Sequence, residues 1–557
     1  MSSAALPAHP IAGVSYRTES EALAHYRSGA WLRATIRDAA RRAGTLHRDR
    51  PFLIAEGSST SFADFDIRTE RLAAALLDEG LVPGDRAIFQ MGTTPDTAIA
   101  LVGCFKAGIV PVCTLPQHRE IEIGQIGELA AARAYFVQAD FHPTFDLVAF
   151  ARKMAESLRS RPMLIVAGGG GAASGRSLGG LIEPVNSAAA RGGVDRVTLR
   201  PSDVAMFQLS GGSTGVPKII PRMHGEYLAQ ARDWNERNHL GASDVSLWCL
   251  PLIHNAGIIT SFLPCLLAGR ALVLQPAFRE KSFLDAVARH KVTYTGSIGP
   301  IAGRLLESPH LARYDLRSLR QIWAFNRADD LEARLGATAQ NIYGITEGIL
   351  MCSSPNASPE RRHRTIGNPV GRGDEILLRA IDGTEPVPDG ELGELCFKGA
   401  SVLSAYYGTA RDPAHFTDDG FFRTGDVLRA TWIDGERCFV FEGRLKDNIS
   451  RGGEKYGAEE VETLLVKHPA VLDARVVAMP DRLYGEKGCA FLILREGRAS
   501  PSLAELGDFL LGLGLAKYKL PERIEVLEQF PLTRVGKVDK VQLREGIAAV
   551  VRSEQAT

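Results

Sequence analysis

The chain of 557 residues has no net charge at neutral pH, because its 65 lysines and arginines balance its 65 aspartates and glutamates. Proteins that hold nucleic acid or acidic membranes through net charge carry an excess of basic residues. The balance therefore argues against nucleic-acid and membrane binders of this kind, and leaves open only a local basic patch.

Paired cysteine motifs are also missing. The cysteines at positions 104, 113, 249, 265, 352, 396, 438 and 489 are scattered, with no Cys-x-x-Cys and no His/Cys cluster at zinc spacing. Scattered cysteines without a metal pattern are typical of reduced thiols in a cytosolic protein. We therefore predict a cytoplasmic location.

The sequence lacks a long uninterrupted hydrophobic run. Residues 1–13 contain no basic region followed by an apolar block, so no secretory signal is predicted. The most apolar stretch, residues 97–115, is interrupted by Lys106, Gly108 and Pro111. A lysine is costly inside a bilayer, so this stretch is interpreted as a buried helix that passes into a buried strand.

The length of the chain predicts more than one hydrophobic core. Alternating helix and strand patterns from residue 31 to residue 166 predict a parallel sheet with helices on both faces. From about Gly371, short strands punctuated by Asp-Gly turns predict an antiparallel or barrel-like subdomain. After residue 447, a helix, two strands and a further helix predict a compact α+β unit.

Helices are expected at residues 31–44, 65–80, 458–467 and 503–513, and strands at 52–55, 60–62, 87–89, 204–209, 246–250, 292–295, 321–324, 474–478 and 489–494. Residues 167–180, rich in glycine, are expected to be a flexible surface connection.

Residues 209–218 stand out, because they place three glycines, three hydroxyls and a lysine directly after an apolar run. Glycines allow main-chain N–H groups to approach an anion closely, and Ser210, Ser213, Thr214 and Lys218 add donors and charge. Pro217 precedes the lysine and Ile219 follows it, so the spacing excludes the P-loop of the NTPases. Taken alone, the stretch fits either a solvated turn or a phosphate-binding loop.

Further motifs follow this loop in a fixed order. They are Tyr343-Gly344-Ile345-Thr346-Glu347, Gly393-Glu394-Leu395, Tyr407-Gly408, Phe422-Arg423-Thr424-Gly425-Asp426, Gly443-Arg444-Leu445-Lys446-Asp447, Arg451-Gly452-Gly453-Glu454-Lys455 and Pro531-Leu532-Thr533-Arg534-Val535-Gly536-Lys537. With these motifs the chain resembles the adenylate-forming superfamily. Within it, the segments 208–215, 220–222, 251–255 and 449–455 are most similar to the stand-alone aryl-acid AMP ligases that activate 2,3-dihydroxybenzoate or salicylate.

The resemblance implies an α/β fold in two parts. Residues 1–446 would form a large N-terminal domain of layered βα subdomains with a barrel-like β subdomain, and would hold the ATP and aryl-acid sites. Residues 447–557 would form a small, mobile α+β domain. Lys446 and Asp447 would be the hinge between them, and Gly452 and Gly453 would line the tunnel of a pantetheine thiol.

The resemblance also implies an ATP and Mg²⁺ site. Thr214, Lys218, Glu347 and Lys537 are the expected catalytic residues, and Glu347 and Thr214 the expected Mg²⁺ ligands. The expected ATP-binding residues are Ser210, Gly211, Gly212, Ser213, Thr214, Gly215, Lys218, Asn341, Ile342, Tyr343, Gly344, Thr346, Glu347, Asp426, Arg444 and Lys537. Read singly, Glu347 fits a solvated loop carboxylate, Arg444 a surface ion pair and Lys537 an exposed lysine.

The acid pocket is expected from the same resemblance. Its candidate residues are His254, Asn255, Ala256, Thr260, Gly296, Ser297, Phe325, Ile349 and Leu350. Ala256 stands where the aryl ligases have a large aromatic residue, so a larger or differently substituted ring is expected to fit. An amide such as that of Asn255 can bond to an ortho hydroxyl or to an ortho amino group. His254 alone fits a core histidine equally.

The implied reaction is activation of an ortho-substituted aromatic acid as an aryl-adenylate, followed by transfer to a phosphopantetheine thiol. The acceptor is expected to be either an aryl or peptidyl carrier protein or free coenzyme A, as in an anthranilate-CoA ligase. A catalytically silent nucleotide-binding relative is the alternative of a different class. The protein is expected to be a monomer or a homodimer.

Overall fold

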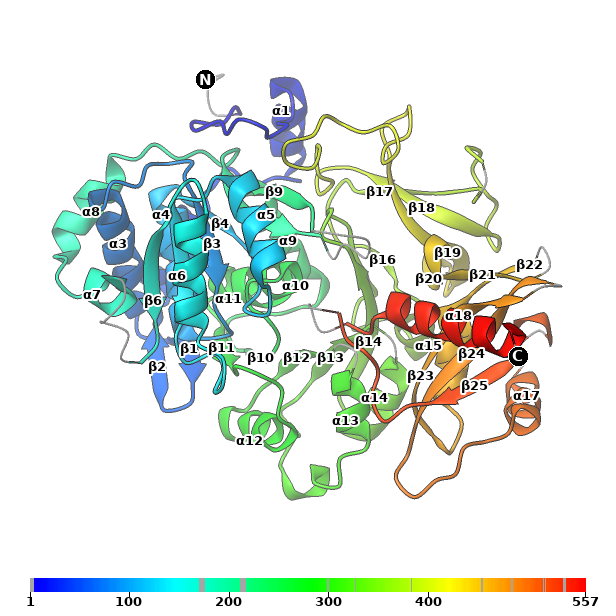
Figure 1. Cartoon of the computed structure of the whole chain (residues 1–557). Helices are drawn as coiled ribbons and strands as arrows, with labels where there is room; N and C mark the ends of the chain where they lie inside the picture. The colour runs from blue at the N-terminus through cyan, green and yellow to red at the C-terminus, as the bar shows by residue number, and fades with distance from the viewer. Residues whose placement is uncertain are drawn as a thin grey trace.

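The computed structural model describes residues 5–169, 176–210, 217–297, 300–325, 327–381, 383–451, 454–481, 484–513, 515, 517–533 and 537–556. Figure 1 shows two layered βα lobes, a yellow β subdomain and a C-terminal part in orange and red at one side of the molecule. This is the α/β architecture that the sequence predicted.

The first large sheet has seven strands in the order β7-β6-β5-β3-β4-β8-β9. They are β3 (Arg86–Gln90), β4 (Val110–Val112), β5 (Ala134–Gln138), β6 (Met163–Ala167), β7 (Arg176–Ser177), β8 (Val204–Leu209) and β9 (Ile219–Met223). All neighbours pair in parallel except β8 and β9. The carboxyl end of β8 therefore leads directly into the predicted phosphate loop, at an edge of the kind where open α/β sheets bind ligands.

The second large sheet has nine strands in the order β16-β15-β14-β13-β12-β10-β11-β1-β2. They are β1 (Pro51–Ala55), β2 (Ser58–Ser61), β10 (Val245–Trp248), β11 (Ala271–Leu274), β12 (Tyr294–Ser297), β13 (Gln321–Ala324), β14 (Thr338–Gly344), β15 (Leu350–Cys352) and β16 (Asn368–Pro369). Its centre is parallel, and antiparallel strands close both edges.

Helices fill the space between these sheets and cover their outer faces. The inner helices are α2 (Ile36–Leu46), α3 (Phe62–Asp78), α4 (Pro95–Ala107), α9 (His224–Arg237), the π-helix η3 (Ile258–Phe262) and α11 (Leu263–Ala268); their side chains share one apolar cluster with both sheets. The others in this lobe are α1 (Glu19–Ser28), α5 (Glu120–Ala130), α6 (Leu147–Ser157), α7 (Leu178–Ile182), α8 (Ser187–Asp195), α10 (Asn255–Gly257), α12 (Glu280–His290), α13 (Pro300–Leu306), the 3₁₀ turn η4 (Leu311–Arg313), α14 (Ala328–Leu335) and α15 (Pro359–Arg364).

The predicted antiparallel subdomain is confirmed by β17 (Glu375–Arg379), β18 (Leu392–Lys398), β19 (Phe422–Ile433) and β20 (Glu436–Arg444). The 3₁₀ turn η5 (Leu445–Asp447) then leads to a separate sheet of β21 (Asn448–Arg451), β22 (Glu454–Gly457), β23 (Val471–Asp481), β24 (Gly485–Leu494) and β25 (Arg523–Val526). Helices α16 (Ala458–Leu465), α17 (Leu503–Gly512), η6 (Lys517–Lys519) and α18 (Lys540–Ala556) pack around it.

Two predicted boundaries were wrong. Helix α2 begins at Ile36 rather than at residue 31, because Thr35 caps it: the Thr35 hydroxyl accepts from the amide of Asp38, and the Asp38 carboxylate accepts from the amide of Thr35. The expected connection at 167–180 contains the helix α7 from Leu178 onward. Residues 170–175 of that connection lie outside the described residues.

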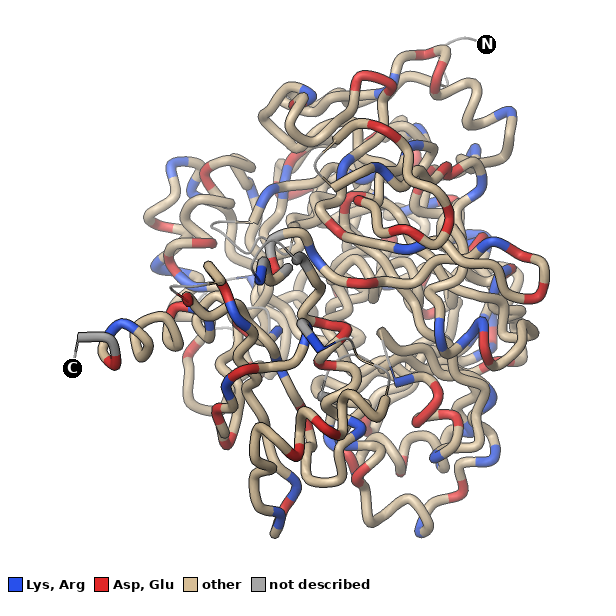
Figure 2. The backbone as a smooth tube through the Cα atoms, turned by 90° about the vertical axis from the view of Figure 1, so that its right-hand side faces the viewer, with Lys and Arg blue, Asp and Glu red and all other residues tan. Residues whose placement is uncertain are grey.

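The apolar stretch at 97–115 is a buried helix and strand, as predicted. Its Lys106 is buried and donates to Asp66 at 2.5 Å and to Glu70 at 2.8 Å, so the buried charge is paired. All eight cysteines are buried free thiols. In the part of the chain that the structure describes, no helix has the length and apolarity to cross a membrane. Figure 2 shows basic and acidic residues interspersed along the backbone.

Candidate active site

The base of the phosphate loop is held by main-chain and side-chain hydrogen bonds. The amide of Ser210 donates to the carbonyl of Lys218 at 2.9 Å, and the amide of Lys218 donates to Oγ of Ser210 at 3.0 Å. These bonds extend the β8–β9 pairing by one step, so both ends of the loop are anchored to the sheet. Gly211, Gly212, Ser213, Thr214 and Gly215 lie outside the described residues.

Lys218 and Glu347 both contact the side chain of Tyr406. Nζ of Lys218 lies 4.5 Å from the ring centroid of Tyr406, and the Tyr406 hydroxyl donates to Oε1 of Glu347 at 2.9 Å. Nζ of Lys218 also lies 2.8 Å from Nε2 of His415. The fold thus brings a cation suited to phosphate and a carboxylate suited to a hard metal ion to the same place, although they are far apart in the chain.

The carbonyl of Glu347 is held from inside the protein. It accepts from Nη1 of the fully buried Arg222 at 3.4 Å and from the amide of Leu403 at 2.9 Å. Arg222, on β9, in turn pairs with Glu226 in the first turn of α9. Because both neighbours are buried, the main chain at Glu347 is fixed while its carboxylate stays half-buried.

Asp426 is a buried carboxylate shared by two predicted site residues. The Tyr343 hydroxyl donates to Oδ2 of Asp426 at 2.6 Å, and Nε of Arg444 lies 3.1 Å from Oδ1. Asp426 and Arg444 are direct partners in the β19–β20 register. Burial, followed by the adjacent Asp426 carboxylate, raises the pKa of Tyr343 well above its ordinary value, so the phenol keeps its proton. Each oxygen of the Asp426 carboxylate therefore has a partner, and these contacts fix its orientation.

The other residues expected to bind ATP differ in their exposure to solvent. Asn341 donates from Nδ2 to the carbonyl of His363 at 2.6 Å, and Ile342 is buried in the core that both sheets share. Gly344 is exposed and Thr346 half-buried. Phe422 packs on Phe397 and Phe416.

Lys537 of the C-terminal part lies within electrostatic reach of His254. Burial and, second, the positive charge of Lys537 lower the pKa of His254 to about 4. His254 is nevertheless exposed to solvent. This exposure excludes the core histidine that the sequence alone allowed.

Residues near His254 form one wall of the expected acid pocket. Nδ1 of His254 accepts from the amide of Ala256 at 3.3 Å, which caps α10, and the Thr260 hydroxyl donates to the Ala256 carbonyl at 2.7 Å. Asn255 is buried, and its Oδ1 accepts from the Tyr227 hydroxyl at 2.7 Å. Ala256 is half-buried, so no large side chain fills this position.

The other residues expected to line the acid pocket differ in exposure and in the core to which they belong. Phe325 is 45% exposed and lies edge-on to Trp323 at 6.1 Å between ring centroids. A Cβ at Gly296 would meet the Trp323 indole at 2.2 Å, so the indole already occupies the space beside this glycine. Ser297 is fully buried. Leu350 belongs to the core that both sheets share, whereas Ile349 packs into the core of the β17–β20 subdomain.

The turn η5 (Leu445–Asp447) marks the expected hinge. Oδ1 of Asp447 accepts from Arg544 of α18 at 3.2 Å. Arg495, which directly follows β24, pairs with Glu307, which follows α13, and so ties the C-terminal sheet to the nine-stranded lobe. Gly452 and Gly453 lie outside the described residues.

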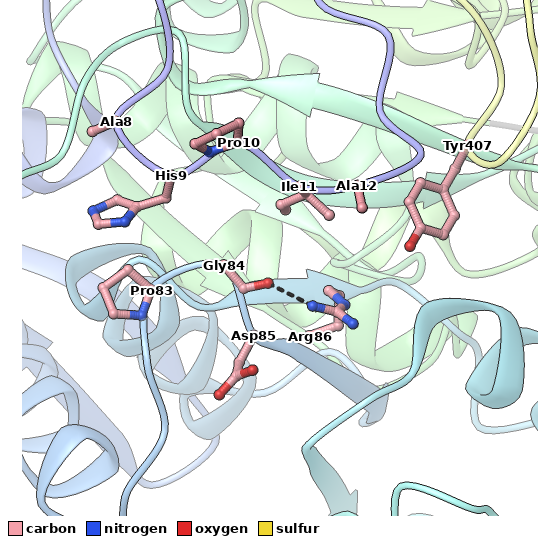
Figure 3. A pocket seen from close by; sticks show the side chains of 10 residues that line it. All are labelled: Ala8, His9, Pro10, Ile11, Ala12, Pro83, Gly84, Asp85, Arg86 and Tyr407. Atoms are coloured by element: carbon pink, nitrogen blue, oxygen red, sulfur yellow. Dashed lines mark hydrogen bonds between the residues drawn. The ribbon is translucent and has the colours of Figure 1, made fainter.

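A pocket of about 430 Å³ lies elsewhere, between the N-terminal segment and the turn before β3 (Figure 3). Its His9 contacts the carbonyl of Thr198 at 2.6 Å, and its Arg86 donates to the carbonyls of Gly84 and Ala130. None of the predicted site residues lines this pocket. The side chains of His9, Asp85 and Arg86 already have protein partners, so we do not identify this pocket with the site.

Comparison with known proteins matches this chain to a family. The profile described as AMP-binding enzyme matches residues 40–407, and that of the AMP-binding enzyme C-terminal domain matches residues 460–537. The chain belongs to the AMP-binding enzyme family. The predicted resemblance to adenylate-forming enzymes is confirmed.

Three similar proteins cover nearly the whole of this AMP-binding enzyme. The 2,3-dihydroxybenzoate-AMP ligase of Bacillus subtilis is 36% identical over 94% of this chain and 95% of its own length. The salicyl-AMP ligase / salicyl-S-ArCP synthetase of Mycobacterium tuberculosis is 34% identical over 94% and 92%. The solved anthranilate CoA ligase AuaEII is 22% identical, covers 94% and 98%, and has a TM-score of 0.83. At that identity the last comparison shows the fold alone.

Four residues of this AMP-binding enzyme were missed by the sequence analysis, namely Gln208, Tyr227, Tyr406 and His415. Gln208 is the first residue of the segment 208–215 and Tyr406 directly precedes Tyr407-Gly408, so their position at the edge of a motif was the available signal. Tyr227 lies beyond the segment 220–222 and had no such signal. His415 belongs to no motif that we recognised, and only the tertiary contact with Lys218 reveals it.

Proposed function

We propose that this enzyme uses ATP to activate an ortho-substituted aromatic carboxylic acid as an aryl-adenylate and then transfers the acyl group to a phosphopantetheine thiol. The observation that carries the proposal is that Lys218 and Glu347, from distant motifs, both contact Tyr406. A cation suited to phosphate and a carboxylate suited to a metal ion therefore lie at one place, as an ATP site requires. The names of the two AMP ligases above support an aryl acid as the substrate.

In the first step an oxygen of the acid's carboxylate attacks the α-phosphorus of ATP, and the bond to the pyrophosphate oxygen breaks. The step needs positive charge near the phosphates and fixed orientation of the reacting oxygens. We assign Lys218, with Ser210 and Thr214, to the β- and γ-phosphates. Asp426 and Arg444 would hold the ribose, and Lys537 would bridge the acid's carboxylate and the α-phosphate.

Magnesium fits the residues present. Among the described residues no group of three or more His, Cys, Asp or Glu side chains could hold a metal ion. Glu347 offers its second carboxylate oxygen at this place, since the Tyr406 hydroxyl donates to Oε1. Mg²⁺ typically takes one or two carboxylates and completes its shell with phosphate oxygens and water. When bound, the ion would neutralise phosphate charge, with Glu347 and Thr214 as its protein ligands.

The second step requires Lys537 to leave and a thiol to enter. We assign the hinge to Lys446 and Asp447, and the thiol tunnel to Gly452 and Gly453, with residues 1–446 and 447–557 as the two moving parts. The thiol attacks the acyl carbon, and AMP leaves with the electrons of the anhydride bond. Carrier-protein phosphopantetheine is the proposed acceptor, because the salicyl-AMP ligase above is also named a salicyl-S-ArCP synthetase.

Acid-dependent exchange of labelled pyrophosphate into ATP tests the first step. We expect exchange with salicylate, 2,3-dihydroxybenzoate or a bicyclic aryl acid. No exchange with any of them would leave the silent nucleotide-binding relative as the better interpretation. For the second step, incubation with an aryl carrier protein and with coenzyme A decides the acceptor, and rapid CoA thioester formation would contradict the carrier assignment.

A further inference from the structure

An irregular stretch of the chain is buried beside Lys218 and Glu347. In the described residues 399–406 the chain forms neither helix nor strand, and most of these residues are buried. We call residues 399–406 the support loop. A buried backbone carbonyl that has no partner in a helix or sheet is costly unless another group donates to it. The donors to this loop therefore decide where it is held.

The support loop carries two contacts to the candidate site. The amide of Leu403 donates to the carbonyl of Glu347 at 2.9 Å, and the Tyr406 hydroxyl donates to Oε1 of the same residue at 2.9 Å. The Tyr406 ring also has Nζ of Lys218 at 4.5 Å from its centroid. A shift of the loop would therefore change the geometry between Lys218 and Glu347.

Two side chains from the N-terminal segment donate to the carbonyls of the support loop. Nη2 of Arg17 donates to the carbonyl of Val402 at 2.8 Å and to that of Gly399 at 3.1 Å. Nε1 of Trp31 donates to the carbonyl of Ala400 at 2.9 Å. Arg17 precedes α1 and Trp31 follows it, so both ends of this helix are attached to the loop; α1 lies beside the yellow β subdomain in Figure 1.

The surroundings of both donors strengthen these hydrogen bonds. Trp31 is 5% exposed, lies edge-on to Tyr26 at 5.6 Å between ring centroids, and shares an apolar cluster with Ala400. Arg17 is half-buried, and burial lowers its pKa below the ordinary value, although an arginine stays charged at neutral pH. A charged donor makes a stronger hydrogen bond than a neutral one.

Asp374 holds the support loop through a different set of atoms. Its Oδ1 accepts from the amide of Ser401 at 3.1 Å, and its Oδ2 accepts from the Ser401 hydroxyl at 2.6 Å. A carboxylate only accepts, so Asp374 cannot satisfy the carbonyls of the loop. Arg17 and Trp31 are therefore not redundant with it.

We propose that Arg17 and Trp31 are positioning residues of the ATP and magnesium site. They act through the support loop, which fixes Tyr406 and with it the geometry between Lys218 and Glu347. The inference rests on the proposed function and gives a role in it to a segment in which the sequence analysis found no motif.

Arg17→Gln removes the charged donor and should loosen the support loop. With the full-length protein and excess Mg²⁺, we expect the Kd for ATP, measured by calorimetry, to rise about 5–10-fold. The Mg²⁺ concentration for half-maximal pyrophosphate exchange should rise by a similar factor. KM for the aryl acid should change by less than about twofold, because the expected acid pocket lies at α10, β12 and β13 rather than at this loop. Arg17→Lys keeps the charge and should restore most of the loss.

Arg37→Gln is the matched control. Arg37, on α2, also donates through a single nitrogen to two backbone carbonyls, those of Val194 at 3.2 Å and Val197 at 2.9 Å. Its loss should lower the unfolding midpoint and leave the Kd for ATP and the Mg²⁺ requirement unchanged. If Arg17→Gln behaved in the same way, its role would be merely structural and the inference would be overturned.

Trp31→Phe tests the inference even if the Arg17 variant does not fold. It keeps a ring against Tyr26 and removes only the donor to Ala400, so the Kd for ATP should rise about 2–5-fold. An unchanged Kd in this variant would overturn the part assigned to Trp31.

A double variant tests the route through Tyr406. Residues that act through one another have non-additive effects. Arg17→Gln should therefore raise the Kd for ATP by a smaller factor in a Tyr406→Phe background than in the wild type. Equal factors in both backgrounds would overturn the route.

The binding measurement keeps this inference and the proposed function apart. If the wild type binds ATP but exchanges pyrophosphate with no aryl acid, the proposed function is overturned, while the Kd values still test the support loop. If the wild type does not bind ATP, both are overturned.

Discussion

Nζ of Lys218 lies 2.8 Å from Nε2 of His415, so the lysine assigned to the phosphates of ATP donates to a neutral imidazole. Burial, followed by the charge of Lys218, lowers the pKa of His415 below its ordinary value. The imidazole is therefore an acceptor at neutral pH. It holds the lysine beside the Tyr406 ring, next to Glu347.

Replacing His415 should weaken ATP binding more than acid binding. His415→Phe keeps a ring against Tyr406 and Phe422 and removes the acceptor, so we expect KM for ATP in pyrophosphate exchange to rise about 10-fold. His415→Gln keeps an acceptor and should restore most of the loss. Equal KM values for ATP in the wild type and the Phe variant would refute the positioning of Lys218 by His415.

Lys537→Ala should separate the two half-reactions. We expect adenylate formation to fall by about 100-fold or more, since the charge that bridges the two reacting groups is lost. Thioester formation from supplied aryl-adenylate should change little. The pKa of His254 should rise, because the positive charge that lowers it is removed. NMR titration of the His254 ring, compared with an exposed His239→Gln variant as assignment control, measures this rise; an unchanged pKa would show that Lys537 does not reach the pocket.

Gly348→Ala should disturb the Glu347 site. Gly348 has φ of 148°, and a Cβ there would lie 2.0 Å from the carbonyl oxygen of Ser401. The main chain next to Glu347 must shift, so we expect a loss of about 1–3 kcal/mol in stability and a higher Mg²⁺ requirement for exchange. Gly241→Ala is the control, because a Cβ at that position would have no atom within 4 Å. Thermal unfolding and Mg²⁺ titration measure the two effects, and identical behaviour of both variants would contradict the prediction.

Acid should destabilise the protein partly through His224. This ring is buried, and burial followed by the charge of Arg37 lowers its pKa from 6.5 to about 3, while Nδ1 accepts from the amide of Ile36. The unfolded chain binds a proton below about pH 6.5, and the folded chain does so only near pH 3, so stability falls as the pH falls through this window. Between pH 6.5 and pH 5 the contribution is about 2 kcal/mol.

His224→Gln should therefore reduce the loss of stability between pH 7 and pH 5, even if it is less stable at pH 7. The unfolding midpoint at both pH values measures the difference, and exposed His239→Gln serves as the control. A pH dependence equal to that of the wild type would show that His224 already titrates normally in the folded protein.

Much of the fold followed from local patterns. The run at Val204–Leu209 is a strand that ends at the phosphate loop, and the Asp-Gly turns after Gly371 do separate antiparallel strands. These features depend on the periodicity of neighbouring residues, which the sequence displays directly. The start of α2 was misplaced because the apolar pattern continues N-terminal to the Thr35 cap, and the cap decides where helical hydrogen bonding begins.

For the candidate site, too, local motifs could be predicted from the sequence and tertiary contacts could not. The residue types that suit phosphate, ribose, metal and acid could be read from motifs, because each motif is a short local stretch. The contacts between motifs could not be read from the sequence. That Lys218 and Glu347 share Tyr406, and that Tyr343 donates to Asp426, depends on strands and loops that are distant in the chain.

By itself, the sequence determined the family, the order of the domains and the kinds of side chain at the site, since these reside in residue identity and spacing. Only the tertiary structure decided that Lys218 contacts His415 and that Tyr343 donates to Asp426. The physical reason is that each contact joins elements distant in the chain, which only the packing of the fold brings together. Tyr343 lies on β14 and Asp426 on β19.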